Sequence, residues 1–382
     1  MSYRKELVAL AERFGMENKK QKVGIVTLPG NFNYGNRLQN YAVAQAYESR
    51  GFQAESLVLT DRPNALRDLK QLVRKLLRKP VSHPEDNMSE ERLEAFQRFN
   101  KNMCTGVVNF DELNPKEYAF FSVGSDQVWN LGYIKYNEDW FFLDFAKKEQ
   151  RIALAPSIGL DALDERQSRR LAKGVRNFPL LSVREERGAE LIYEASGMRA
   201  EVICDPTLVL TPEEWDAVSS DSLTPKEPYI FTYLLGGIGS EASDVLKQLH
   251  SLNRYPVISL TDRDDGSELP AGPAEFISLI KNAAFVVTDS FHAAVFSSIF
   301  ETPLSIVHRD GVSMFSRLQT LAEKLGTENK IYNGGTLSLE TASDYAGVAE
   351  RIAGERERFN AYLSLALNQN SSNDSQHEVV NG

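Results

Sequence analysis

The chain has 382 residues and a formal net charge of −10 at pH 7. This length suits two domains of ordinary size, each able to bury its own core. The acidic balance argues against nucleic-acid binding by the whole surface. The two cysteines, Cys104 and Cys204, are too far apart in the sequence to indicate a disulfide framework or a zinc ribbon. Because the chain has neither a signal-like start nor an apolar segment long enough to span a bilayer, we expect a cytoplasmic protein.

Predicted strands alternate with predicted helices in the first part of the chain, as is typical of parallel sheets covered by helices. The expected strands are residues 23–27, 54–59, 118–123, 152–155, 180–183 and 202–204. The expected helices are residues 37–50, 66–78 and 89–101. Polar or glycine-rich residues follow most of the strands. Since the carboxyl ends of parallel strands meet at one edge of a sheet, this pattern predicts a cleft there.

A second α/β series starts after residues 219–228, which have the composition of a linker. Its expected strands and helices are residues 229–234, 240–253, 257–260, 273–282, 285–288, 291–300 and 303–307. We therefore expect an α/β fold with two Rossmann-like domains that face a cleft. The expected domains and extensions are residues 1–222, residues 223–345, a helix at 346–367 that bridges back to the first domain, and a disordered tail at 368–382.

The segment from Thr288 to His292 joins a buried strand to a helix and carries Asp289, Ser290 and His292. Free N–H groups at the start of a helix favour an anionic ligand. An imidazole beside them can donate to a phosphate or move a proton. In the alternative interpretation Ser290 caps the helix and His292 packs in the core. The sequence leaves both interpretations open.

Two further loops carry the hydrogen-bonding side chains that sugars need. Their candidate residues for binding an acceptor are Asn33, Gly35, Asn36, Ser125, Asp126, Gln127, Trp129 and Asn130. Trp129 can stack on a sugar ring or lie in the core, and both alternatives remain open. Neither the first loop nor the segment 236–239 has the G-x-G-x-x-G spacing, which argues against a dinucleotide cofactor.

Several segments together resemble the polysaccharide pyruvyl transferase family, over roughly residues 22–310. The matching segments, in family order, are Asn33–Tyr41, Gly124–Asn130, Ser182–Glu185, Asp205–Thr207 and Thr288–His292. The resemblance implies a GT-B-like architecture. It also implies transfer of pyruvate from phosphoenolpyruvate to two hydroxyls of a galactose-type sugar as a cyclic ketal, in bacterial exopolysaccharide or capsule biosynthesis. Ala293 stands where family members often carry glycine, and its methyl group narrows the expected donor pocket.

Phosphoenolpyruvate carries a carboxylate and a phosphate, for which arginine is a suitable ligand. We expect Arg184, Arg187, Asp289, Ser290 and His292 to bind this donor, with Arg184 and His292 taking part in catalysis. Arg187 can instead pair with Glu190 on the surface. The histidines are scattered and lack carboxylates at coordinating spacing, so we expect neither a metal nor another cofactor. The alternatives are a glycosyltransferase that uses a nucleotide sugar, and a carbohydrate-binding or assembly protein without catalytic activity.

Residues 66–79 predict a helix with an apolar face and a basic remainder, in an otherwise acidic chain. This composition is typical of a helix that lies on an anionic membrane surface. Such contact at the inner membrane face would bring the cleft to a lipid-linked acceptor. The alternative is that the apolar face packs on the parent sheet and the charges are solvated.

Overall fold

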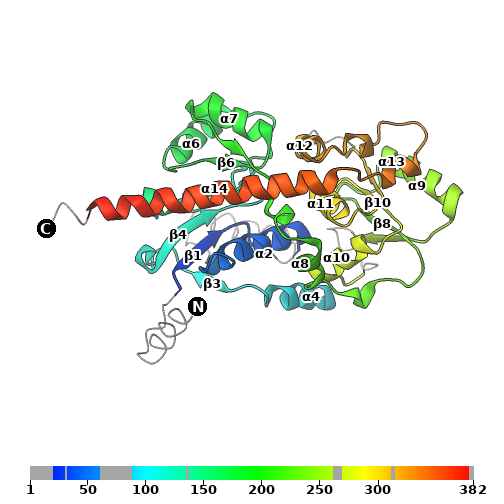
Figure 1. The fold of residues 1–382 in the computed structure, drawn as a ribbon, viewed down its shortest axis with the longest axis horizontal. Helices are drawn as coiled ribbons and strands as arrows, with labels where there is room; N and C mark the ends of the chain where they lie inside the picture. The colour runs from blue at the N-terminus through cyan, green and yellow to red at the C-terminus, as the bar shows by residue number, and fades with distance from the viewer. Residues whose placement is uncertain are drawn as a thin grey trace, which may run out of the picture.

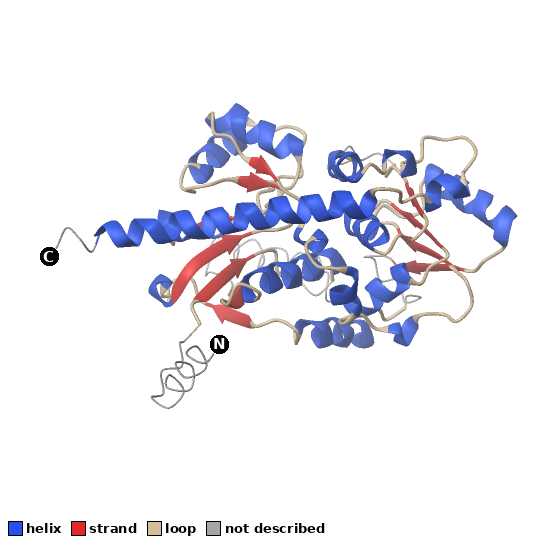
Figure 2. Cartoon of the chain, in the orientation of Figure 1, coloured by secondary structure: helices blue, strands red, loops and turns tan. Residues whose placement is uncertain are grey.

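The computed structural model describes residues 20–30, 32–60, 88–134, 137–260, 269–310 and 315–377. Two parallel sheets, each flanked by helices, occupy opposite ends of the described part of the chain (Figures 1 and 2). This arrangement confirms the α/β fold class, with two Rossmann-like domains. The predicted basic helix at 66–79 lies outside the described residues.

The first sheet is five-stranded and parallel, with the order β3-β2-β1-β4-β5. Its strands are β1 (Lys22–Val26), β2 (Gln53–Leu59), β3 (Thr105–Val108), β4 (Tyr118–Val123) and β5 (Arg151–Ala153). The central strands β1 and β4 are buried along most of their length, as expected where helices cover both faces. A separate two-stranded parallel sheet consists of β6 (Ser182–Val183) and β7 (Glu201–Val202).

The helices around the five-stranded sheet and the two-stranded sheet follow the strands along the chain. They are α2 (Tyr34–Glu48), α4 (Glu90–Asn100), α5 (Glu138–Phe141), α6 (Glu165–Val175), α7 (Glu186–Ser196) and α8 (Pro212–Asp216). The short 3₁₀ turns are η2 (Pro115–Glu117), η3 (Lys148–Gln150), η4 (Pro206–Leu208) and η5 (Asp221–Leu223). Not all of these elements stay with the first half of the chain, since α4, α8, η4 and η5 contact helices of the second half.

The second sheet is four-stranded and parallel, with the order β11-β10-β8-β9. Its strands are β8 (Ile230–Tyr233), β9 (Val257–Leu260), β10 (Phe285–Thr288) and β11 (Leu304–Ile306). Its helices are α9 (Ser240–Asn253), α10 (Pro273–Lys281), α11 (Phe291–Ile299), α12 (Ser316–Leu325), the turn η6 (Glu328–Lys330) and α13 (Leu339–Ser343). All four residues of β10 are buried, so this strand positions the start of α11 rigidly.

The last helix, α14 (Val348–His377), runs along the length of the molecule (Figure 1). It contacts both halves, because the Tyr362 hydroxyl donates to the Ala153 carbonyl at 2.8 Å while Lys324 of α12 donates to Glu355 at 2.8 Å. The helix extends to His377, beyond residue 367, where the predicted bridging helix ends. After Gly354 the helix contains no glycine or proline, so a polar composition alone does not end it.

One of three hydrophobic clusters spans the two halves of the chain. Tyr34 of α2 stacks on Phe276 of α10 with ring centroids 4.8 Å apart, and its hydroxyl donates to the Ala271 carbonyl at 3.1 Å. Trp215 of α8 meets Phe296 of α11 edge-on at 4.9 Å. Side chains from the first half of the chain therefore complete the core of the second half.

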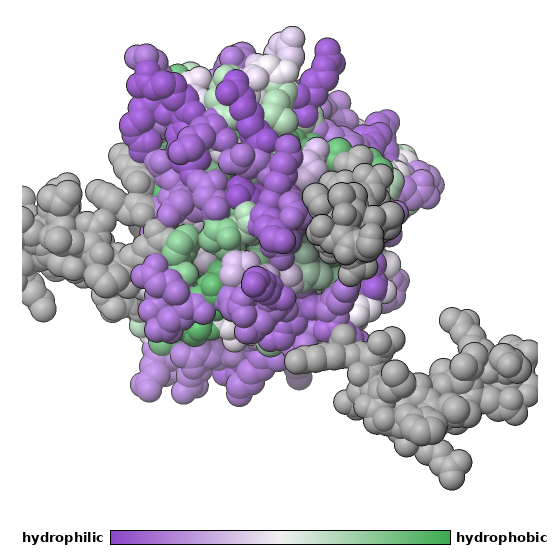
Figure 3. All heavy atoms as spheres, turned by 90° about the vertical axis from the view of Figure 1, so that its left-hand side faces the viewer, coloured by the Kyte–Doolittle hydropathy of each residue, from purple (hydrophilic) through white to green (hydrophobic). Residues whose placement is uncertain are grey.

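The surface at the left end of Figure 1 is mostly hydrophilic, with hydrophobic residues gathered across its middle (Figure 3). Among the described helices, none combines the length and the apolar character that a bilayer crossing needs.

Candidate active site

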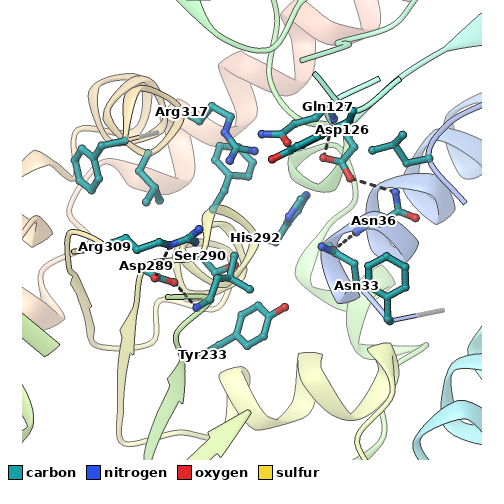
Figure 4. A pocket seen from close by; sticks show the side chains of 18 of the residues that line it. Asn33, Asn36, Asp126, Gln127, Tyr233, Asp289, Ser290, His292, Arg309 and Arg317 are labelled. Atoms are coloured by element: carbon teal, nitrogen blue, oxygen red, sulfur yellow. Dashed lines mark hydrogen bonds and ion pairs between the residues drawn. The ribbon is translucent and has the colours of Figure 1, made fainter. Parts of the chain in front are cut away.

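A cavity of about 410 Å³ lies between the two halves of the molecule (Figure 4). Its lining from the first half comes from the loop after β1, the start of α2 and the loop after β4. Its lining from the second half comes from the segments after β8, β10 and β11 and from α12. The polar lining residues are Asn33, Asn36, Asp126, Gln127, Asp289, Ser290, His292, Arg309 and Arg317. The strand ends thus meet where the sequence predicted a cleft.

His292 lies in the first turn of α11, close against α2. An added Cβ at Gly35 would stand only 1.9 Å from His292 Nδ1, so a side chain at position 35 would displace the imidazole. His292 Nε2 is buried without a hydrogen-bond partner, and Asp205 Oδ2 lies 3.8 Å away. An unpartnered buried nitrogen at a cavity is available to a ligand.

The pKa of His292 lies well below its ordinary value, at about 4, because burial and the charge of Arg184 disfavour the imidazolium. Asp205 acts in the opposite direction but does not outweigh them. The imidazole of the unliganded protein is therefore neutral near pH 7 and can accept a proton.

Arg184 directly follows β6 and is buried, so this predicted donor-binding residue does not itself line the cavity. Its Nη1 donates to Asp205 Oδ2 at 2.5 Å, and its guanidinium carbon lies 4.6 Å from the ring centroid of Phe291. Its Nε and Nη2 are buried without a hydrogen-bond partner, and Asp126 Oδ1 lies 3.8 Å from Nη2. These two donors remain for an anion.

Asp205 anchors this charged group from the turn η4. It accepts from both the backbone N–H and the hydroxyl of Thr207, and from Ser125 as well as Arg184. Burial raises the pKa of Asp205, but the Arg184 and His292 charges outweigh burial and lower it to about 2. The carboxylate thus stays ionised and holds Arg184 in place.

The start of α11 offers backbone donors to the cavity. Ser290 is the N-cap residue, yet its side chain makes no capping hydrogen bond, and the first turn contains no acidic residue. Ser290 and His292 both line the cavity. The N–H groups of this turn and the helix dipole favour a negative group there.

Asp289 and Arg309 form an ion pair at the cavity wall. Asp289 accepts from the backbone N–H groups of Leu235 at 2.7 Å and Gly236 at 3.0 Å, and from Arg309 Nε at 2.9 Å. Although Asp289 lines the cavity, as the sequence predicted, its carboxylate is occupied by protein donors. It therefore positions the loop after β8 and Arg309.

On the opposite wall, Asn33, Asn36 and Asp126 lie together as predicted. Asn33 caps α2 by accepting from the Asn36 N–H at 2.9 Å, and Asn36 Nδ2 donates to Asp126 Oδ2 at 3.1 Å. Burial raises the pKa of Asp126, but Arg184 and His292 outweigh this and the pKa lies below its ordinary value. An ionised carboxylate and a carboxamide thus face the cavity.

Three predicted acceptor residues do not line the cavity. Trp129 is fully buried, stacks on Phe142 at 5.5 Å and donates to the Phe141 carbonyl at 3.0 Å, so the core interpretation is correct. Asn130 is buried and accepts from the Gly132 N–H at 3.0 Å. Ser125 is buried behind the cavity, where its hydroxyl meets Ala155 and Asp205. The loop turns these side chains inward because the indole buries a large apolar surface.

The prediction that Arg187 binds the donor is wrong. Its guanidinium donates to Glu190 at 2.7 Å and to Glu194 at 2.8 Å on the outer face of α7. Glu186 begins α7 directly after Arg184 and Glu185, so Arg187 is the second residue of the helix and its side chain lies on the outer face.

Several lining residues were not predicted from the sequence. Arg309 follows β11 and Tyr233 ends β8, so both obey the same strand-end pattern that revealed Asp289. Arg317 lies on α12, whose buried residues Leu318, Leu321 and Leu325 have readable helical spacing. Phe32, Tyr133 and Phe315 supply aromatic wall, which a sequence pattern does not distinguish from core.

The cavity combines donors for an anion with a neutral base. Arg317 and the α11 N-terminus can bind negative groups at the cavity, Arg184 is buried behind the lining residues, and His292 can transfer a proton. Within the described ranges, no group of three or more histidine, cysteine or acidic side chains could hold a metal ion.

Fold and cavity together define a GT-B-like α/β protein, with two Rossmann-like domains around a polar cavity. The sequence matches the family model described as polysaccharide pyruvyl transferase over residues 33–307. The chain belongs to the polysaccharide pyruvyl transferase family and is thus a polysaccharide-modifying transferase. The match includes Arg184 and His292 and ends before Arg309 and Arg317.

Solved structures with similar folds are distant in sequence. A UDP-GlcNAc 2-epimerase from Methanocaldococcus jannaschii has 11% identity and a TM-score of 0.44, with 88% of this chain and 92% of that chain covered. A putative UDP-N-acetylglucosamine 2-epimerase from Listeria monocytogenes has 8% identity and a TM-score of 0.43, with coverages of 89% and 90%. The glycosyltransferase SnogD from Streptomyces nogalater has 11% identity and a TM-score of 0.39, with coverages of 91% and 100%. No curated protein matches the sequence.

Proposed function

We propose that this transferase moves pyruvate from phosphoenolpyruvate to two hydroxyls of a sugar, forming a cyclic ketal. The observation that carries the proposal is a set of buried nitrogens without hydrogen-bond partners, namely Nε2 of His292, which lines the cavity, and Nε and Nη2 of Arg184, which lies behind the lining residues. These nitrogens lie beside the uncapped N-terminus of α11. Such a concentration of donors suits a small, highly charged donor substrate.

The reaction needs proton transfers that His292 is placed to make. One sugar hydroxyl adds to C2 of the donor, the enol methylene carbon gains a proton and becomes methyl, and phosphate leaves with the C–O electron pair. A second hydroxyl then closes the ketal. The two sugar hydroxyls release two protons. One is added to the methylene carbon, which becomes methyl, and the other leaves with phosphate. A neutral His292 can take the first hydroxyl proton and deliver it to carbon.

The acceptor side of the proposal rests on the wall formed by the first half of the chain. Asn33, Asp126 and Gln127 offer hydrogen bonds to sugar hydroxyls. Tyr133 lines the cavity while 61% exposed, so an aromatic face is accessible at the mouth. We propose a galactose-type sugar, carried on a membrane lipid, as the acceptor that this wall receives.

The test is turnover of phosphoenolpyruvate with a panel of galactosides, beside a panel of nucleotide sugars. We expect phosphate release and ketal formation with phosphoenolpyruvate only. Loss of His292 as an acid–base group should lower kcat by about 10²–10⁴-fold in His292→Ala. Arg187→Gln, which removes a surface arginine, is the matched control and should retain wild-type activity. Turnover of a nucleotide sugar without phosphoenolpyruvate consumption would establish glycosyl transfer instead.

A further inference from the structure

Arg317 projects into the cavity from the first turn of α12 (Figure 4). Burial lowers the pKa of Arg317, and the like charge of Arg184 lowers it further. Within the part of the chain that the structure describes, no carboxylate oxygen lies within the 4.0 Å of an ion pair with this guanidinium. Arg317 differs in this respect from Arg184, which pairs with Asp205, and from Arg309, which pairs with Asp289.

The partner of Arg317 is a neutral amide. When the Gln127 carboxamide is oriented with its oxygen toward Arg317, this oxygen accepts hydrogen bonds from Nη1 and Nη2 of Arg317, both at 3.2 Å. The amide fixes the plane of the guanidinium without forming an ion pair with it, and the negative charges of Glu185 and Asp126 act on Arg317 only from beyond ion-pair distance. Withdrawing such a charge from water is costly unless an anion arrives to pair with it.

The two negative groups of the proposed donor suit different parts of the cavity. A phosphate matches the N–H groups at the start of α11 and the nitrogen of His292. The planar fork of an arginine matches a carboxylate in a bidentate pair. Arg317 and His292 both line the cavity, so the two positions lie in one site.

We propose that Arg317 binds the carboxylate of the donor and distinguishes a carboxylated enol phosphate from a phosphate ester without a carboxylate. This inference rests on the proposed function and adds to it a specificity-determining residue. Gln127 is then a positioning residue, which orients Arg317 without competing for its charge.

The experiment compares two probes by calorimetric titration of the full chain, namely 2-phosphoglycolate, which carries both anionic groups, and inorganic phosphate. In Arg317→Gln the Kd for 2-phosphoglycolate should rise about 10–100-fold, the range for loss of a charge-assisted hydrogen-bonded pair. The Kd for inorganic phosphate should stay unchanged. Arg317→Lys should recover only part of the loss, because an ammonium group lacks the fork. Arg187→Gln is again the control.

A second variant tests the same idea without touching Arg317. Gln127→Glu places a carboxylate of nearly equal size against the guanidinium, so it should weaken 2-phosphoglycolate far more than inorganic phosphate. Thermal unfolding of each variant shows whether it is folded. Equal weakening of both probes, or no weakening, overturns the role of Arg317. If wild-type protein binds neither phosphoenolpyruvate nor 2-phosphoglycolate, the proposed function itself fails, and this inference fails with it.

Discussion

His292 owes its low pKa to burial first and to the positive charge of Arg184 second. Arg184 and Thr207 keep the neighbouring Asp205 ionised. The negative charge of Asp205 favours the protonated imidazole, but not strongly enough to return the pKa of His292 to its ordinary value. In the proposed reaction, the imidazole therefore starts as a base. An anionic donor adds negative charge beside it and favours the imidazolium, which is the form that can give up a proton.

This low pKa predicts a pH-dependent contribution to stability. The unfolded chain protonates His292 as the pH falls through 6.5, while the folded protein resists protonation until about pH 4. The contribution is present above pH 6.5 and is lost as the pH falls between these values, by about 3 kcal/mol in total. Urea unfolding at pH 7 and pH 4.5 should show this loss in wild type. In His292→Gln, which cannot be protonated, the loss should be smaller by about that amount, and equal pH slopes would contradict the prediction.

Cavity residues that follow strands were predicted from the sequence. The prediction was wrong where a side chain packs in the core instead of lining the cavity. Asp126, Asp289 and His292 lie at strand ends, and the topology of a parallel sheet brings such positions together. Trp129 lies in the same loop as Asp126 but gains more from burial beside Phe142. No local pattern reveals that choice, because it depends on contacts between residues distant in the sequence.

At the scale of elements, the start of α2 and the start of α11 approach each other closely because position 35 is glycine. Gly35→Ala should push the imidazole of His292 out of place, since its Cβ would overlap Nδ1. We expect kcat to fall at least about 10²-fold, as for loss of an acid–base group. Steady-state kinetics and a thermal-unfolding scan check this outcome.

The matched control is Gly354→Ala in α14, where an added Cβ meets nothing within 4 Å. That variant should keep full activity and gain up to about 1 kcal/mol from better helix propensity. Full activity of Gly35→Ala would show that the imidazole has room to move and still function.

Helices were harder to predict than strands in this chain. Strands β4 and β10 are short buried apolar runs, which sequence shows directly. Helix α12 has the apolar spacing of a half-buried helix, but no element was expected between the strand at 303–307 and the helix at 346–367. With α12 unrecognised, Arg317 had no predicted neighbour, so the charged end of the cavity was only partly predictable.

At the scale of the whole molecule, α14 connects elements around the first sheet with elements around the second. Glu355 is buried and accepts from Lys324 of α12 at 2.8 Å, and Lys324 also donates to the Val202 carbonyl of β7 at 3.2 Å. One ion pair thus connects the last helix, the second half of the chain and the small sheet.

Removing this carboxylate should destabilise the folded chain as a unit. Glu355→Gln leaves Lys324 without its charged partner, and breaking a buried pair in this way typically costs about 3 kcal/mol. Denaturant unfolding measures the loss, and Glu357→Gln on the exposed side of the same helix is the control. A loss below about 1 kcal/mol would indicate that the pair is effectively solvated.

The shared core of the two halves limits how such a protein can be recombined. Tyr34 and Trp215 come from the first half and fill space against Phe276 and Phe296 of the second. A chimaera made by exchanging halves between relatives at residue 222 would separate these partners and leave cavities or clashes in its centre. A recombination meant to exchange the proposed acceptor preference therefore has to transfer α2 and α8 together with the second half. It should change only the cavity-lining loops of the first half.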